Sequence, residues 1–194
     1  MPSVCFYFQV HQPFRLKPYD CFHIGYDHIY EDEIKNKEIM DRVSVKCYLP
    51  ANKTMLDLIN KHRGKFKIAY SISGTAIEQM EKYRPDVLRS FQALAETGCV
   101  EFLSETYNHS LSFLYSKEEF VRQVNKHKAK INEHFNQVPL VFRNTELIYN
   151  NEIANTAADL GYKAIICEGL DHILGYRSPN FVYHPPHNAK INCL

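Results

Sequence analysis

Short apolar runs alternate with longer stretches of mixed polar and apolar residues along this chain. Each apolar run has the length and the flanking turn residues that are typical of a strand. The five predicted strands occupy residues 4–10, 66–73, 99–103, 140–142 and 163–167. The segments between them are long enough to connect parallel strands.

Helices are predicted between these strands. Ser116 and Glu119 have the Ser-x-x-Glu spacing of a capping box, which marks a helix beginning. Gly98 follows a helical stretch, as glycine commonly does at a helix end. One predicted helix begins at Gly74. A second begins near Pro85 and covers residues 86–97, and two more cover residues 116–135 and 151–160. Strands that alternate with helices favour right-handed crossovers and a parallel sheet.

The predicted fold class is therefore α/β, and the number of strands limits the type of sheet. Five strands with their helices occupy nearly all of the 194 residues, whereas a closed eight-stranded barrel needs roughly 250. After Gly169 the pattern fades, and no sixth strand is predicted. An open parallel sheet is possible, but we favour a β/α barrel truncated after about five strands. Residues 1–194 are then the N-terminal part of one barrel domain.

Composition and charge narrow the possible partners. The chain carries 23 Lys and Arg against 22 Asp and Glu, so its formal charge of +1 favours neither nucleic acid nor an anionic membrane. The six cysteines contain no Cys-x-x-Cys pair, which argues against a zinc or disulfide framework. The first predicted strand begins almost at the N-terminus and leaves no room for a signal peptide, so we expect a cytoplasmic protein.

Polar side chains follow the ends of two predicted strands. His11 and Gln12 come directly after the first strand, which Pro13 ends because proline cannot donate to the sheet. Glu146 follows the fourth strand, just before a predicted helix. The carboxyl ends of parallel strands meet at one edge of a sheet, where ligands bind. A simpler interpretation of Glu146 is an acidic residue favoured by the helix dipole.

A third group of polar residues surrounds the third strand. Glu101 alternates with apolar neighbours, so its side chain points to the opposite face, which is inward in a barrel. A carboxylate there needs a partner, and a structural ion pair is the alternative to a functional role. Glu105 and His109 come later, in the loop, where solvated side chains would be ordinary. We favour a functional role for Glu101 and His109 and weigh both interpretations equally for Glu105.

Together these segments resemble glycoside hydrolase family 57, the family of α-amylases and 4-α-glucanotransferases. The matching segments are His11-Gln12-Pro13, Gly98-x-Val100-Glu101 continuing to His109, and Thr145-Glu146 followed by Tyr149. The resemblance extends from residue 4 to about residue 180. Each motif alone is common, but three in this order at this spacing are specific.

The resemblance implies an incomplete seven-stranded β/α barrel that cleaves or transfers α-glucan bonds with retention of configuration. Glu146 then corresponds to the nucleophile, while His11 and Glu101 correspond to positions that hold the sugar. Gln12 and His109 are weaker candidates for sugar binding. The expected partner is an α-glucan or a maltooligosaccharide, and we expect no metal and no other cofactor. The resemblance does not indicate an oligomeric state.

One part of the family pattern has no counterpart. The general acid of the family is an Asp in a later motif, and neither Glu168 nor Asp171 stands in a segment of that form. We therefore expect the general acid to lie outside this chain, and the chain to be a fragment with weak or no activity. Protonation of the leaving group typically contributes about 10²–10⁴-fold to the rate.

Two other interpretations remain open. A metal-dependent hydrolase similar to polysaccharide deacetylases would use Glu146 as a base. Its His and Asp ligands would come from His11, Asp20, His23, Asp27, His28 and His109. The second alternative is a truncated barrel that binds glucan without catalysis.

Overall fold

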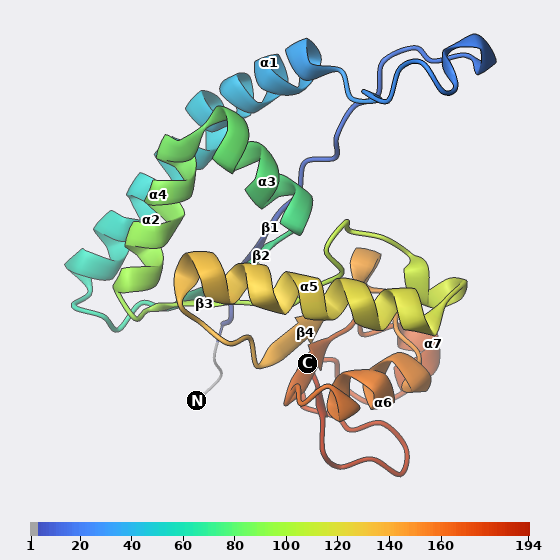
Figure 1. Cartoon of the computed structure of the whole chain (residues 1–194). Helices are drawn as coiled ribbons and strands as arrows, with labels where there is room; N and C mark the ends of the chain where they lie inside the picture. The colour runs from blue at the N-terminus through green and yellow to red at the C-terminus, as the bar shows by residue number, and fades with distance from the viewer. Residues whose placement is uncertain (1–3) are drawn as a thin grey trace. The chain divides into compact units, whose positions relative to one another are not determined.

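The computed structural model describes residues 4–194, which form two compact units (Figure 1). Of the described residues, the first unit contains 4–9, Ala69–Gly74 and Glu101–Leu194, and the second contains Val10–Ile68 and Thr75–Val100. Each unit is described in turn. None of the helices in residues 4–194 is long and apolar enough to cross a membrane.

Two three-stranded parallel sheets supply the strands of the fold. One has the order β1-β2-β3, and the other has the order β4-β5-β6. In the second sheet β4 pairs in parallel with β5, and β5 pairs in parallel with β6. The bounds are β1 (Tyr7–Val10), β2 (Ile68–Ile72), β3 (Val100–Phe102), β4 (Val141–Arg143), β5 (Ala164–Ile166) and β6 (Asn192–Cys193).

A single parallel bridge between Ser104 and Phe142 joins the end of β3 to β4. The Ser104 N–H donates to the carbonyl of Val141 at 2.9 Å, and the Arg143 N–H donates to the carbonyl of Ser104 at 2.8 Å. The predicted α/β class with parallel strands is therefore confirmed.

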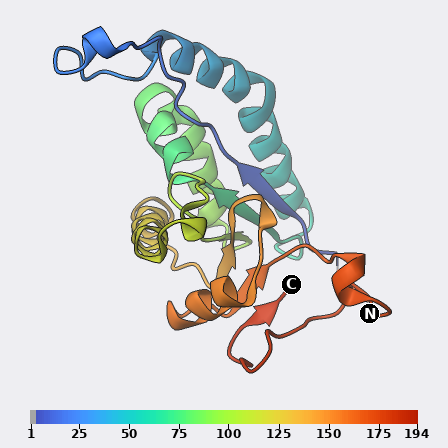
Figure 2. The same ribbon diagram turned by 90° about the vertical axis from the view of Figure 1, so that its right-hand side faces the viewer.

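The predicted end of the sheet is not confirmed, because the described residues contain a sixth strand. β6 is only two residues long, and no apolar run in the sequence predicts it. It forms because the chain returns to β5 after the long loop that leads to the red end of the ribbon in Figure 2. The Asn192 N–H then donates to the carbonyl of Lys163, and the Leu194 N–H donates to that of Ile165, both at 2.9 Å.

The helices of the first unit begin at the capping residues that the sequence indicates. Ser116 accepts a hydrogen bond from the Glu119 N–H at 3.2 Å, which confirms the predicted helix start at α5 (Lys117–Phe135). The second bond of a capping box is not formed, because the Ser116 N–H donates to the carbonyl of Ser112. Asn150 caps α6 (Asn151–Asp159) by accepting from the Ile153 N–H at 2.8 Å. A short α7 (Asp171–Leu174) follows β5.

The core of the first unit centres on Phe142 of β4, which is fully buried. Its ring meets that of Phe120 from α5 nearly edge-on, at 5.7 Å between centroids, and that of Tyr162 at 5.5 Å. Ile153 of α6 and Ile165 of β5 complete the same buried cluster. Offset and edge-on aromatic pairs add to the free energy gained from burying apolar surface.

The second unit is mainly helical, and the helices in its first part were not predicted from the sequence. α1 (Glu33–Val43) continues through a π-helical segment, Ser44–Tyr48, into α2 (Leu49–Lys61). Figure 1 shows α4 (Pro85–Glu96) alongside α2, and Asn52 of α2 donates a hydrogen bond to Ser90 of α4 at 2.8 Å. The predicted helices that open at Gly74 and near Pro85 are confirmed as α3 (Gly74–Tyr83) and α4.

Replacing Phe142 with Ala should destabilise the protein by about 3–5 kcal/mol, because the change leaves a cavity between α5 and β4. Urea denaturation followed by circular dichroism measures the free energy of unfolding. Leu140→Ala, two residues earlier at a position that is 53% exposed, is the matched control and should cost less than about 1 kcal/mol. Equal losses for the two variants would contradict this description of the core.

Candidate active site

Glu146 lies in a tight turn directly after β4. The turn is a 3-10 segment, Thr145–Leu147, in which Glu146 has φ 53° and Leu147 has φ 57°. Residues other than glycine rarely adopt this left-handed backbone conformation, and those that do often lie at functional sites. The turn leaves the Glu146 side chain 71% exposed. Because α6 begins only at Asn151, Glu146 is not a residue of its first turn, and the helix-dipole interpretation is wrong.

The turn is held by hydrogen bonds on both sides. The Asn144 side chain donates to the carbonyl of Ile148 at 2.9 Å, which closes the turn. The hydroxyl groups of Thr145 and Thr106 lie 3.0 Å apart, and both residues are buried. This bond fastens the Glu146 turn to the loop that follows β3.

His109, in that loop, contacts two carboxylates. Its Nδ1 lies 2.8 Å from Oε2 of Glu105, and its Nε2 lies 3.1 Å from Oε1 of Glu146. The imidazole is only 8% exposed, and the backbone of His109 is left-handed, with φ 53°. Burial alone would lower the pKa of His109, but the hydrogen bonds to Glu105 and Glu146 outweigh burial and raise this pKa above its ordinary value.

Glu105 is fully buried beneath His109. Its Oε1 accepts a hydrogen bond from the Ser71 hydroxyl at 2.8 Å, and its Oε2 faces His109. Burial by itself raises the pKa of Glu105, but the hydrogen bonds from His109 and Ser71 bring its pKa below the ordinary value. The interpretation of Glu105 as a solvated loop residue is therefore wrong.

The loop that carries Glu105 and His109 is fixed from two elements. Tyr107 is buried against Gly74, where an added Cβ would lie 2.5 Å from the tyrosine ring. Gln123 of α5 accepts hydrogen bonds from the Asn108 N–H at 3.2 Å and from the Ser110 hydroxyl at 2.9 Å. The position of His109 therefore depends on packing as well as on its own hydrogen bonds.

Gln9 and Arg143 also lie next to His109, although no pattern in the sequence had singled them out. The amide nitrogen of Gln9 lies 3.1 Å from Nε2 of His109. Arg143, which is 3% exposed, donates from Nη2 to the amide oxygen of Gln9 at 2.9 Å. Their positions at the ends of β1 and β4 are the signal that could have identified them.

The structure brings together only some of the predicted site residues. Glu146 and His109 are in contact. Glu101 lies on β3 on the face opposite its two buried neighbours, as the alternation predicts, but it is exposed and not enclosed as an inward-pointing side chain of a barrel would be. Burial of part of its side chain raises its pKa. Neither Glu168 nor Asp171, which are both exposed, is found in hydrogen-bonding contact with Glu146 among the described residues.

His11 and Gln12 belong to the second unit, where both are half-buried. The Gln12 side chain donates to the hydroxyl of Tyr48 at 3.3 Å and accepts from Arg15 at 2.8 Å. Its backbone carbonyl accepts from Gln79 at 2.7 Å. These contacts fix the backbone after β1 within that unit.

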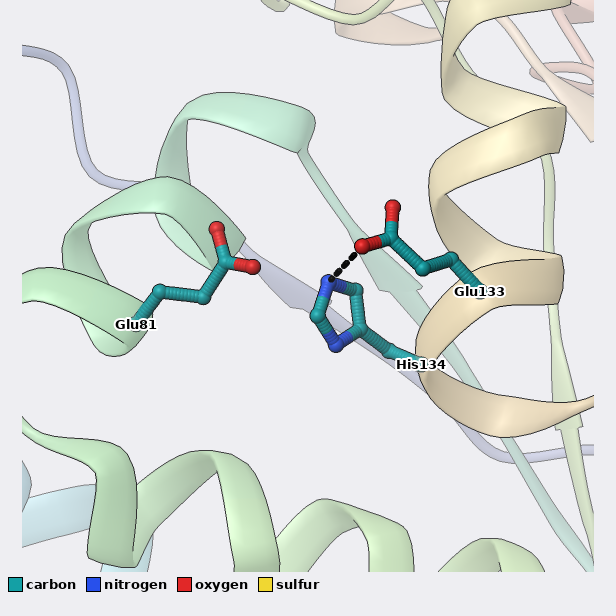
Figure 3. A group of neighbouring side chains, drawn as sticks. All are labelled: Glu81, Glu133 and His134. Carbon is teal, nitrogen blue, oxygen red and sulfur yellow. Dashed lines mark ion pairs between the residues drawn. The ribbon is translucent and has the colours of Figure 1, made fainter.

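The residues considered as metal ligands do not form a cluster. His11, Asp20, His23, Asp27 and His28 of the second unit contain no group of three whose ligand atoms lie together, within the part of the chain that the structure describes. Asp27 instead pairs with Lys17 at 2.6 Å. Figure 3 shows Glu133 and His134 of α5, which form an ion pair at 3.8 Å. It also shows Glu81 of α3, a residue of the second unit.

Comparison with known proteins identifies the family. Residues 5–194 match the model of glycosyl hydrolase family 57. Over 190 residues the chain is 45% identical to a protein of Methanocaldococcus jannaschii named "Putative alpha-amylase", and the match covers 97% of this chain and 40% of that protein. The chain therefore spans less than half the length of this relative.

Two solved structures share the fold at low sequence identity. The 4-α-glucanotransferase of Thermococcus litoralis matches 98% of this chain and 27% of its own, with a TM-score of 0.71 and 15% identity. A Mycobacterium smegmatis protein named "putative polysaccharide deacetylase" matches 84% of this chain and 51% of its own, with a TM-score of 0.58 and 11% identity. Taken with the family match over nearly the whole chain, these findings show that the chain belongs to glycosyl hydrolase family 57.

Proposed function

We propose that Glu146 is the nucleophile of a retaining glycosidase or transglycosidase that acts on α-glucans or maltooligosaccharides. The observation that carries the proposal is the geometry of its carboxylate, which is exposed to solvent yet oriented by His109 through a 3.1 Å contact. A nucleophile must reach the substrate and must also be held in one orientation. Membership of the family and the α-amylase relative support the same substrate class.

A retaining mechanism needs a second carboxyl group roughly 5–5.5 Å from the nucleophile, which protonates the leaving oxygen. Glu105 is unsuited to this role, because it is fully buried and its pKa is lowered mainly by the bond from His109, against the effect of burial. A general acid requires access to the leaving group and a raised pKa. We therefore propose that the acid is not among the residues that surround Glu146 here.

We further propose that the sugar is held by His11 and Glu101, with Gln12 and His109 as weaker contributors. This assignment depends on the family resemblance of the segments that carry them. Residues 1–194 would in this proposal form the N-terminal part of a catalytic barrel domain.

Glu146 should become covalently labelled by 5-fluoro-α-glucosyl fluoride. Attack by its carboxylate forms a bond to the anomeric carbon and releases fluoride, which needs far less protonation than a sugar alcohol does, so the label can form without the general acid. Mass spectrometry of the digested protein should find one 5-fluoroglucosyl group on the peptide that contains Glu146.

The controls for labelling are Glu146→Gln, which should not react, and Glu152→Gln, which should react as the unchanged chain does. Glu152 is an exposed carboxylate on α6 that pairs only with Lys117 at 3.6 Å among the ion pairs found in the described residues. A label on another carboxylate, or no label at all, would refute the proposed nucleophile.

Hydrolysis of maltoheptaose by the 194-residue chain should be weak, by about 10²–10⁴-fold relative to a complete retaining enzyme, because leaving-group protonation is missing. Chromatography of the released oligosaccharides measures this rate. Ordinary turnover that disappears in Glu146→Gln would mean that another group of this chain supplies the acid.

A further inference from the structure

We propose that Glu105 is a positioning residue for Glu146, because it holds His109 as an imidazolium whose Nε2–H is directed at the Glu146 carboxylate. The inference rests on the proposed role of Glu146 as nucleophile. It assigns a specific function to a side chain for which the sequence left a functional and an ordinary role equally weighted. The argument depends on three neighbouring groups: Glu105, His127 and His109.

Burial makes the charge of Glu105 dependent on its partners. A carboxylate that loses all contact with water is strongly disfavoured unless hydrogen bonds and an opposite charge compensate it. Oε1 accepts from the Ser71 hydroxyl and Oε2 faces Nδ1 of His109, both at 2.8 Å. The serine supplies a neutral donor, so the compensating positive charge must come from a histidine.

His127 of α5 is not that cation. Its Nε2 lies 2.8 Å from the carbonyl oxygen of Ile72, so Nε2 must carry a proton and donate it. Its Nδ1 accepts from the backbone N–H of Glu105 at 3.3 Å, so Nδ1 must be unprotonated. The ring is therefore neutral, in agreement with complete burial, which lowers the pKa of His127.

His109 has the opposite surroundings. Both ring nitrogens face carboxylate oxygens, which only accept hydrogen bonds, so the doubly protonated ring satisfies both contacts. The resulting chain of groups runs from buried Glu105 through His109 to exposed Glu146. A largely exposed carboxylate is thereby connected to the interior of the unit through a ring that is almost completely buried.

Gln9 and Arg143 favour the other protonation state of His109, the neutral ring. Arg143 holds the oxygen of the Gln9 amide, which directs the amide NH₂ toward Nε2 of His109. This NH₂ can donate only to an unprotonated Nε2, and the positive charge of Arg143 also disfavours the imidazolium. Glu105 and Glu146 favour the charged ring, whereas Gln9 and Arg143 favour the neutral one.

The charged ring serves the proposed chemistry in two ways. A hydrogen bond to Oε1 of Glu146 fixes the carboxylate and leaves Oε2 for the anomeric carbon. Glu146 loses its negative charge when it forms the glycosyl ester and regains it when the ester is hydrolysed. A cation fixed in place before the reaction stabilises the carboxylate as it leaves.

Glu105→Gln tests the inference, because it keeps the size of the side chain and removes its charge. His109 should then titrate at lower pH than in the unchanged chain, because it loses the buried carboxylate that faces its Nδ1. NMR of the histidine ring protons measures this titration.

His109→Gln supplies the second variant, and it keeps the test decisive even if Glu105→Gln does not fold. Labelling of Glu146 by 5-fluoro-α-glucosyl fluoride should be slower in this variant, because Glu146 loses the side chain that orients it. The double variant Glu105→Gln/His109→Gln should be labelled at the rate of His109→Gln alone, because Glu105 acts through the histidine. Glu152→Gln is the matched control and should leave the labelling rate and the titration of His109 unchanged. An unchanged labelling rate in either single variant would overturn the inference.

Labelling with 5-fluoro-α-glucosyl fluoride separates this inference from the proposed function. In Glu105→Gln the labelling rate should fall by up to about 10²-fold, because the carboxylate of Glu146 is no longer held in one orientation. If Glu146 is never labelled but the titration of His109 changes as expected, the proposed nucleophile fails and the positioning contact stands. If labelling of Glu146 occurs at the same rates in both proteins, only the positioning role fails.

Discussion

The pairing of Ser104 with Phe142 is the contact on which the site depends. Two backbone hydrogen bonds join the end of β3 to β4 at this point, and both residues are fully buried. The Ser104 hydroxyl also lies 2.7 Å from that of Tyr162, which fastens the bridge to the aromatic core. Because Glu105 follows Ser104 and Glu146 lies just beyond Arg143, this register places the two carboxylate-bearing loops next to each other.

The site combines a rigid interior with an exposed reacting group. Glu105 and His127 are fully buried, whereas the carboxylate of Glu146 is largely exposed. Burying polar and charged groups is costly, and the hydrogen bonds made by Glu105 and His127 offset this cost for those two side chains. The two successive left-handed residues at Glu146 and Leu147 add local strain. The hydrogen bonds of the flanking loops and the packing of the core must compensate that strain.

Local patterns predicted most of the elements in the first unit but not those of residues 31–65. The helix cap at Ser116 and the apolar runs of β2 and β4 are visible without tertiary structure, because caps and periodicity are local properties. In contrast, α1 buries only Asn36 and Met40, so it lacks an obvious apolar stripe. β6 was missed for a related reason, since two residues carry no periodic signal and pairing with β5 alone defines them.

The sequence by itself determined which residue types follow the strands, and therefore the family resemblance and Glu146, Glu101 and His109 as candidates. Only the tertiary structure decided which of them meet. For Glu105 the sequence favoured neither a functional role nor that of a solvated loop residue, yet the side chain is buried beneath His109. Gln9, which is 100 residues away in the sequence, contacts the same imidazole ring. Burial and the distances between side chains depend on how remote segments pack, and no local pattern along the chain encodes them.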